Sequence, residues 1–300
     1  MKAAGSHLSE VAAVAQRLAV LLAAGVAPVS AWMYVAEASS STIASAVVSN
    51  GDPPAAILAA APGFSTLESE AWRGLAAAWW VATSAGAPLA PSLRDYAHSI
   101  RALAGAQRDL QVALAGPIAT ARMVMALPAI GIVFGVALGF DTLHTLLATA
   151  PGWLCLALGC ALLFAASRWN RRLIAAAQPP AAAPGLECDL MAIAVSGGGS
   201  LERARVLIGQ CIERFGLVVE VGRTHEVLEL SRRAGVPAGE LLRSEGTELR
   251  RAARAEAQER AARLSVRLML PLGLCVLPAF MVVGVFPLLL SVISSTVDSF

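Results

Sequence analysis

The amino-acid sequence predicts an all-α integral membrane protein with three transmembrane helices and two homologous cytoplasmic helical-bundle domains. Composition is the first reason, because 57% of the 300 residues are hydrophobic and only 15% are charged, unlike an ordinary soluble domain. The second reason is that three apolar stretches each reach the roughly 20 residues that cross about 30 Å of hydrocarbon. The third is a glycine–proline turn that occurs twice, each time ahead of an apolar stretch.

Residues 1–116 are expected to form the first cytoplasmic helical domain. Within them, LAVLLAAGVAPVSAWMYVAEA (18–38) admits three interpretations: a signal sequence, a fourth span, or a buried helical hairpin of a soluble domain. The GVAP turn in its middle and the charged residues Arg17 and Glu37 at its borders favour the hairpin.

The rest of the chain divides into spans, loops and a second domain. From residue 117 the predicted order is transmembrane helix 1 (117–140), a short external loop (141–151), transmembrane helix 2 (144–167), a basic and Pro/Ala-rich linker (168–184), cytoplasmic domain 2 (185–266), transmembrane helix 3 (268–293) and an external tail (294–300). All 23 Lys and Arg residues lie before Leu127 or between Arg168 and Arg267. Cationic residues near span ends favour the cytoplasmic side of a membrane. We therefore expect a multi-pass membrane protein with a cytoplasmic N-terminus and an external C-terminus.

The two cytoplasmic domains are predicted to be copies of one another. Residues 85–113 align without a gap with residues 234–262, and nine of the 29 positions are identical. The identical pairs other than alanine are Gly86 with Gly235, Pro88 with Pro237, Leu93 with Leu242, Arg94 with Arg243 and Arg101 with Arg250. The first two pairs, Gly86 with Gly235 and Pro88 with Pro237, are the repeat turns.

A weaker correspondence concerns the hairpins that precede these turns. It places the helix–turn–helix of residues 18–31 over residues 191–204. The charged residues after the second turn exclude a membrane span there, which argues against a span in the first copy too.

Two features of the predicted spans concern packing. Gly131, Gly135 and Gly139 recur every four residues and form one stripe, on which another helix of this or a second chain can pack closely. The alternative is that glycine is simply common in membrane helices. The prolines of the third span are Pro271, Pro278 and Pro287. Each removes a backbone donor and bends the helix, so we expect the third span to pack against protein.

The helix after the second turn carries charges of both signs. Its candidate docking residues are Arg243, Arg250, Arg251, Arg254 and Glu256. A solvated face with pairing between successive helical turns is one interpretation, and a docking face for a cytoplasmic partner is the other. Basic residues next to the spans can also meet anionic membrane lipid. Nucleic-acid binding is not expected, because acidic residues are interleaved and aromatic residues are missing.

The sequence does not contain the residue patterns of an enzyme. The four histidines are scattered, and the glycine-rich SGGGS (196–200) lacks the lysine of a phosphate-binding loop. We therefore predict no catalytic residues, cofactor or metal site. Apart from Arg122 near the start of the first span, the spans lack Lys, Arg, Asp and Glu away from their ends, whereas coupled carriers usually keep such groups inside their spans. Two other functions stay open from these observations: a small oligomeric membrane permease or channel subunit, and a membrane-anchored scaffold.

The order of domains and spans resembles the F-type platform proteins of type II secretion and type IV pilus machines. GPIATARMVMALPAIGIVFGVALGF (116–140) with WNRRLI (169–174) looks like the B component of the tight-adherence (Tad) pilus system. LPLGLCVLPAFMVVGVFP (270–287) looks like the C component, in the form found in actinobacteria. The resemblance covers roughly residues 65–174 and 185–290.

This resemblance implies a function that composition alone does not. Such proteins sit in the inner or plasma membrane with other platform subunits, bind a cytoplasmic secretion ATPase and act on pilin subunits, without an active site of their own. The charged helix face is then the candidate ATPase-docking face. The two components usually occur as separate paralogues, so this chain looks like a fused pair.

Overall fold

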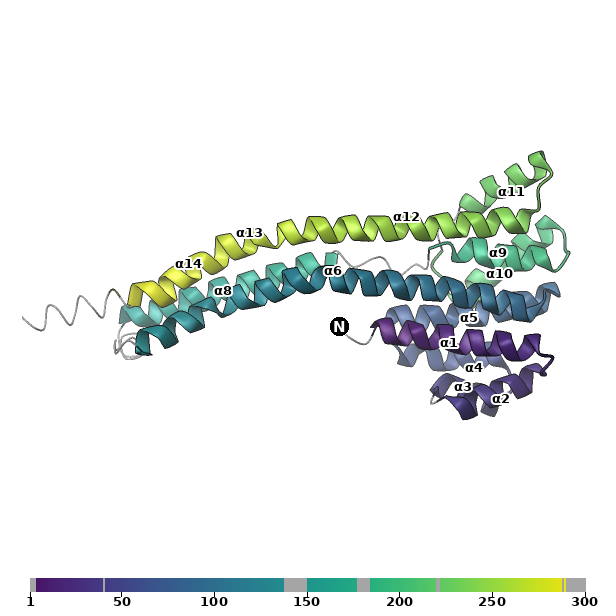
Figure 1. The fold of residues 1–300 in the computed structure, drawn as a ribbon, viewed down its shortest axis with the longest axis horizontal. Coiled ribbons are helices and arrows are strands. Elements are labelled where there is room, and N and C mark those ends of the chain that lie inside the picture. The colour runs from purple at the N-terminus through teal and green to yellow at the C-terminus, as the bar shows by residue number, and fades with distance from the viewer. Residues whose placement is uncertain are drawn as a thin grey trace, which may run out of the picture. The chain divides into compact units, whose positions relative to one another are not determined.

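The computed structural model describes residues 4–39, 41–137, 150–176, 184–219, 222–287 and 289, and every regular element in them is helical (Figure 1). The all-α prediction is confirmed for this part of the chain. The longer helices are α1 (Ala4–Ala23), α2 (Pro28–Ala38), α3 (Thr42–Asn50), α4 (Pro53–Ala60), α5 (Thr66–Ala85), α6 (Leu89–Ala137), α8 (Ala150–Ala176), α9 (Leu186–Ser196), α10 (Leu201–Phe215), α11 (Arg223–Ala234) and α12 (Ala238–Arg267). A short 3₁₀ turn, η1 (Ala61–Gly63), precedes α5.

The chain forms two compact units. Unit 1 comprises residues 1–109 and 180–256, and unit 2 comprises residues 110–179 and 257–300. Unit 1 thus combines most of both predicted cytoplasmic domains, which the sequence analysis treated as separate bundles. Local sequence patterns carry no information on whether two distant segments share a core.

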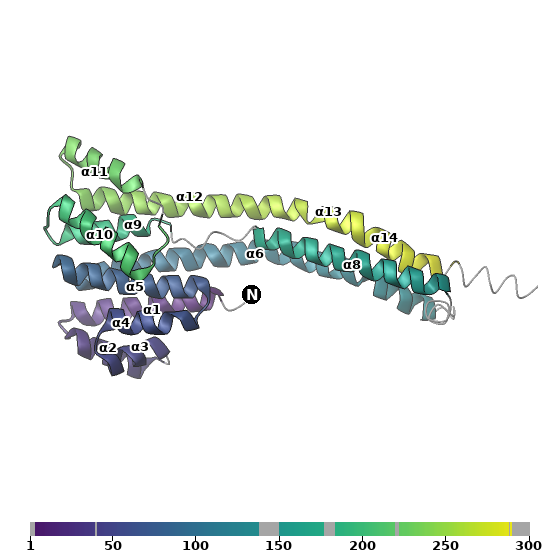
Figure 2. The same cartoon turned by 180° about the vertical axis from the view of Figure 1, so that it is seen from behind.

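Helix α5 lies at the centre of unit 1, next to α1 and α4 from the first segment and α9 and α10 from the second (Figure 2). Its many alanines let neighbouring helices approach closely, and its tryptophans fill the remaining space. Trp79 packs on Trp32 of α2 with ring centroids 5.8 Å apart, and Trp80 lies 6.1 Å from the Phe215 ring of α10. The two segments therefore share one hydrophobic core.

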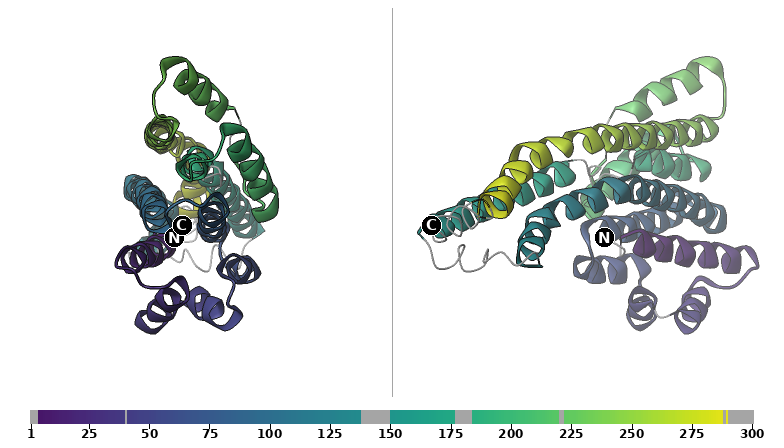
Figure 3. Two further views of the ribbon diagram at one scale, coloured as in Figure 1. Left: turned by 90° about the vertical axis from the view of Figure 1, so that its right-hand side faces the viewer. Right: turned by 60° about the vertical axis from the view of Figure 1, so that its left-hand side comes forward.

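Both predicted helical hairpins are present in unit 1 (Figure 3). The first joins α1 to α2 through Gly25, whose φ of +86° few residues other than glycine adopt. Helix α1 buries an apolar face that includes Leu8, Val11 and Leu18, so it is part of the hydrophobic core of unit 1. It is not one of the helices that are long and apolar enough to cross a membrane. The second hairpin joins α9 to α10 through Gly198.

Three helical stretches of the described residues are long and apolar enough to cross a membrane, as predicted. They are Leu89–Phe134, Gly152–Ile174 and Ala238–Val285. The predicted external loop lies mainly, and the predicted external tail wholly, outside the described residues.

The third span changes helix type around its prolines. It continues from α12 as α13 (Met269–Pro271), the π-helical segment η2 (Leu272–Val276), α14 (Leu277–Phe280) and the π-helical segment η3 (Met281–Val285). In an α-helix the rings of Pro278 and Pro287 would meet the carbonyls four residues earlier, and both carbonyls lie inside the widened segments. The span packs on α8, in agreement with the expectation that such a helix needs protein contacts.

Glycines allow the helices of unit 2 to touch. A Cβ atom at Gly131 would lie 3.0 Å from the Phe280 ring and 3.6 Å from the Cα of Gly284, so the first and third spans meet there. The contact is therefore made within one chain. Gly135 also lies in α6, whereas Gly139 falls outside the described residues.

Helix α8 approaches the third span more closely still. A Cβ atom at Gly159 would lie 2.0 Å from Cγ2 of Val283. Replacing Gly159 with leucine should destabilise unit 2 by about 1–3 kcal/mol, because the larger side chain overpacks this contact. The matched control is Gly273→Leu in the third span, since a Cβ atom at Gly273 meets nothing within 4 Å. Denaturation of both variants in mixed micelles measures the difference, and equal stability of the two would contradict the close contact.

Candidate functional site

Helix α12 presents three arginines that pair with aspartates elsewhere in unit 1. Arg243 Nε lies 2.9 Å from Asp95 of α6, Arg250 lies 2.8 Å from Asp189 of α9, and Arg254 pairs with Asp109 of α6. The arginines follow one another at intervals of seven and four residues, which places them on one side of the helix. The two α6 partners occur in the same order along the chain, so α6 and α12 run parallel here.

The Asp189–Arg250 pair is the buried centre of this arrangement. The two side chains are only 9% and 13% exposed. Oδ2 of Asp189 accepts hydrogen bonds from the Ser99 hydroxyl and from the Arg250 guanidinium, both at 2.8 Å. Burial raises the pKa of Asp189 above its ordinary value, while the guanidinium and the hydroxyl act against that rise. The Asp189 carboxylate of α9 therefore links this helix to both α6 and α12.

A glycine contact brings the start of α9 onto α12. Gly185 has a φ of +77°, and a Cβ atom there would lie 2.7 Å from the carbonyl oxygen and 2.8 Å from the Cα of Gly246. A Cβ atom at Gly246 would in turn lie 3.0 Å from Oδ1 of Asp189. Both glycines are therefore required for the approach that seats Asp189 against α12.

A second buried acid stands near the start of α9. Oε1 of Glu187 accepts a hydrogen bond of 2.7 Å from the Thr224 hydroxyl of α11. Oε2 of Glu187 is buried without a hydrogen-bond partner among the described residues. Arg223 of α11 lies 3.3 Å from Glu245 of α12. These two contacts join α11 to α9 and to α12.

The five predicted docking residues fall into two groups. Arg243, Arg250 and Arg254 hold α12 to α6 and α9, as described above. Arg251 and Glu256 are on the exposed side, and Arg251 pairs with Glu248 one turn earlier at 2.7 Å. Arg251 therefore takes part in pairing between successive helical turns. This was the alternative to a docking role for the charged face. The aspartate partners could not be predicted from the sequence, because each lies far from its arginine in the chain.

The glycines of the two repeat turns have matching geometry. Gly86 ends α5 with a φ of +70°, and Gly235 ends α11 with a φ of +69°. Only glycine adopts this left-handed conformation readily at the end of a helix.

The prolines of the repeat turns, Pro88 and Pro237, also occupy equivalent places. Pro88 directly precedes α6 and Pro237 directly precedes α12. The Pro88 carbonyl accepts from the Ser92 N–H at 3.3 Å, and the Pro237 carbonyl accepts from the Leu241 N–H at 3.4 Å. Both prolines are exposed, so they start the long helices rather than contribute to the core or to a binding site.

Equivalent arginines of the repeat also make equivalent contacts. Arg101 donates to Gln16 of α1 at 3.2 Å, and Arg250 donates to Asp189 of α9 at 2.8 Å. The two arginines are paired by the alignment of residues 85–113 with 234–262. The hairpin alignment places residues 18–31 over residues 191–204. When it is extended by two residues toward the N-terminus, Gln16 corresponds to Asp189. Homology of the two segments remains a prediction, and this correspondence supports it.

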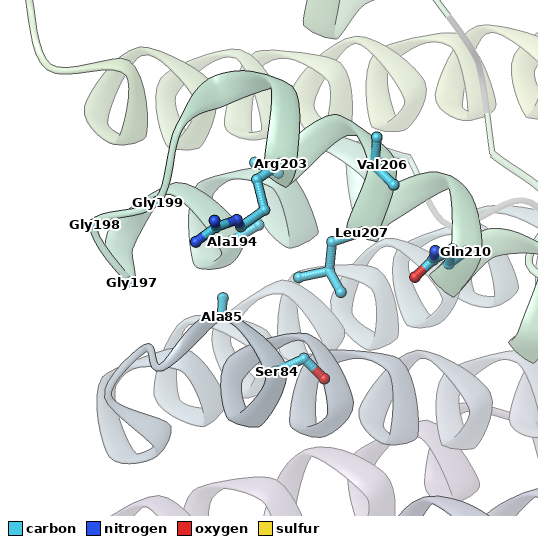
Figure 4. Close-up of a pocket in the computed structure, with 11 residues that line it drawn as sticks. Ser84, Ala85, Ala194, Gly197, Gly198, Gly199, Arg203, Val206, Leu207 and Gln210 are labelled. Carbon is cyan, nitrogen blue, oxygen red and sulfur yellow. The ribbon is translucent and has the colours of Figure 1, made fainter.

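A surface hollow of about 350 Å³ lies beside the glycine-rich turn between α9 and α10 (Figure 4). It is lined by Ser84 and Ala85 of α5 and by Arg203 and Gln210 of α10. A Cβ atom at Gly197 would lie 2.0 Å from the carbonyl oxygen of Ala85, so the turn packs directly on α5. The predicted turn is thus a packing element, and the three polar side chains of the hollow are exposed.

Two thiols of unit 1 should be unreactive in the folded protein. Burial raises the pKa of Cys188 and of Cys211 to about 12 in each case. At pH 8 only about one molecule in ten thousand then carries the reactive thiolate. We expect iodoacetamide to leave both residues unmodified in the native protein and to label both after unfolding, as read by peptide mass spectrometry. Native labelling of either cysteine would contradict the packing around it.

The comparison with protein families gives one match. Residues 14–137 match the model of the family "Type II secretion system (T2SS), protein F". No curated protein and no solved structure matches the chain. The matched region begins in α1, includes α5 and extends through the first membrane-length helix. The match and the three apolar helices together indicate a multi-pass inner-membrane protein. Residues 14–137 are thus similar to protein F of type II secretion systems, which indicates a membrane platform protein of secretion or pilus machinery.

Proposed function

We propose that this chain is a non-enzymatic platform protein of a Tad (type IVb-like) pilus or type II-like secretion machine. In this role unit 1 lies in the cytoplasm, binds a secretion ATPase, and couples its conformational cycle to the assembly of pilin subunits. The observation that carries the proposal is the family match, because it covers cytoplasmic-type helices and the first span together.

The helices offer a physical route for this coupling. Helix α6 has 49 residues in one uninterrupted element, a length of about 74 Å at 1.5 Å per residue. It begins in unit 1 and ends in unit 2, and α12 likewise passes from unit 1 toward the third span. The pairs Arg243–Asp95 and Arg254–Asp109 join these two helices within unit 1. A displacement within unit 1 would therefore move the unit 1 parts of α6 and α12 together.

The exposed side of α12 is the proposed docking face. Arg251 is 73% exposed and its partner Glu248 is 61% exposed, so both are accessible to a partner. A pair this exposed contributes little to stability, which leaves its charges available for recognition.

The test is co-purification of the native secretion ATPase with the full-length protein carrying Arg251→Glu. The matched control is Arg232→Glu on α11, because Arg232 is similarly exposed and also pairs with an acid three residues earlier. We expect Arg251→Glu to reduce ATPase recovery at least tenfold and Arg232→Glu to leave it unchanged. Failure of the wild-type protein to retain the ATPase would contradict the platform role, and equal recovery with both variants would contradict the docking face.

A further inference from the structure

Three potential metal ligands converge near the start of the chain. His7 and Glu10 lie three residues apart on α1 and so share one helix face. Glu68 faces them from the first turn of α5, with 3.3 Å between His7 Nδ1 and Glu68 Oε1. One nitrogen or oxygen of each side chain lies within 4.8 Å of the other two. Within the described residues, this is the one group of three such ligands that converges in this way.

The surroundings of Glu68 favour a cation. Its side chain is only 5% exposed. No lysine or arginine of the described residues forms an ion pair with Glu68, in contrast to Asp189 with Arg250. Two carboxylates therefore meet at a partly buried place where no lysine or arginine among the described residues forms an ion pair with Glu68.

The ligand types select the class of metal. An imidazole nitrogen with two carboxylate oxygens suits Zn²⁺ and similar transition metals, whereas Ca²⁺ and Mg²⁺ prefer oxygen ligands alone. Tetrahedral ligands at about 2.1 Å from a zinc ion lie about 3.4 Å from one another. The site therefore requires rotations of the His7 and Glu10 side chains, which are partly exposed and exposed respectively.

We propose that His7, Glu10 and Glu68 bind a divalent transition-metal ion that fixes α1 against α5. Water would complete the coordination on the exposed side of Glu10. The site goes beyond the proposed platform function and concerns the anchoring of the first helix in unit 1. The sequence analysis predicted no metal site, because the third ligand is distant from the histidine in the chain.

The test uses full-length protein purified in detergent without a histidine tag and stripped of metal with a chelator. Co²⁺ is titrated while its visible d–d absorption is recorded, and Zn²⁺ is then added to displace it. We expect one equivalent of Co²⁺ to bind and Zn²⁺ to raise the unfolding temperature. The variants His7→Gln and Glu68→Gln should each weaken binding at least tenfold.

Two controls make the result specific. Glu70→Gln removes a neighbouring carboxylate of α5, and His225→Gln removes a distant imidazole, so neither variant should change the affinity. Circular dichroism of the metal-free variants tests their folding, and His7→Gln is a safe substitution because His7 is 42% exposed. Absence of saturable binding by the wild-type protein would overturn the proposal. Unchanged affinity in both His7→Gln and Glu68→Gln would overturn it as well.

Discussion

Replacing Arg250 with methionine should reduce the free energy of unfolding of unit 1 by about 3–5 kcal/mol, because Asp189 is then left buried without its counter-charge. Four tryptophans (Trp32, Trp72, Trp79 and Trp80) lie in unit 1, so denaturant unfolding of the full-length protein followed by tryptophan fluorescence reports the loss. The adjacent substitution Arg251→Met is the control. Its ion pair is exposed, so its effect should be about 0–1 kcal/mol.

The defect of Arg250→Met should also depend on pH in a defined direction. The folded-state pKa of Asp189 is raised above its ordinary value of 3.8, and loss of the guanidinium raises it further. A carboxyl with a raised folded-state pKa stabilises the fold in its protonated form, and this stability is lost as the pH rises through that pKa. The variant should therefore recover part of its stability when the pH falls from about 7.5 to about 5. A defect that stays constant or grows on acidification would contradict the buried pair.

Substitution of Gly185 by valine should destabilise unit 1 by about 2–5 kcal/mol. The left-handed conformation contributes about 1–2 kcal/mol of this, and overpacking against the backbone of Gly246 contributes about 1–3 kcal/mol. The backbone cannot move aside as a flexible side chain can. The same fluorescence measurement applies.

Gly198→Val separates the two contributions to this loss. Gly198 has a φ of +80°, close to that of Gly185, but a Cβ atom there meets nothing within 4 Å. Gly198→Val should therefore show the conformational cost alone. If both valine variants lose the same stability, the close approach of α9 to α12 is wrong.

Features that depend on neighbouring residues in the chain were predictable from the sequence. The spans follow from continuous apolar composition, and the two hairpins follow from glycine turns between helical patterns. Likewise, Pro88 and Pro237 marked the residue before each long helix. The prolines of the third span predicted a distorted helix, and the distortion consists of the two π-helical segments. In each case the physical cause lies within a few residues of its effect.

Tertiary features were not predictable in this way. Arg250 and Arg251 are neighbours in a charged run, yet one is buried against Asp189 and the other is exposed. A helical pattern places them on different faces but does not say which face another helix covers. Gly185 and Glu187 also have no distinguishing sequence signal, because their roles depend on contacts with α11 and α12.

The different exposure of Arg250 and Arg251 determines which residue is suitable for testing a docking face. Charge reversal at Arg250 would break the buried pair with Asp189, so a loss of partner binding would report misfolding as readily as docking. Arg251 is the suitable position, since its exposed pair contributes little to the fold.

The most direct test of the account is a topology map of the full-length protein in its own membrane, with reporter fusions at Ala60, Leu146, Glu220 and Asp298. We expect cytoplasmic reporters at Ala60 and Glu220 and external reporters at Leu146 and Asp298. An external reporter at Glu220 would place α9–α12 on the side of the membrane that no cytoplasmic ATPase reaches, and it would contradict the platform function.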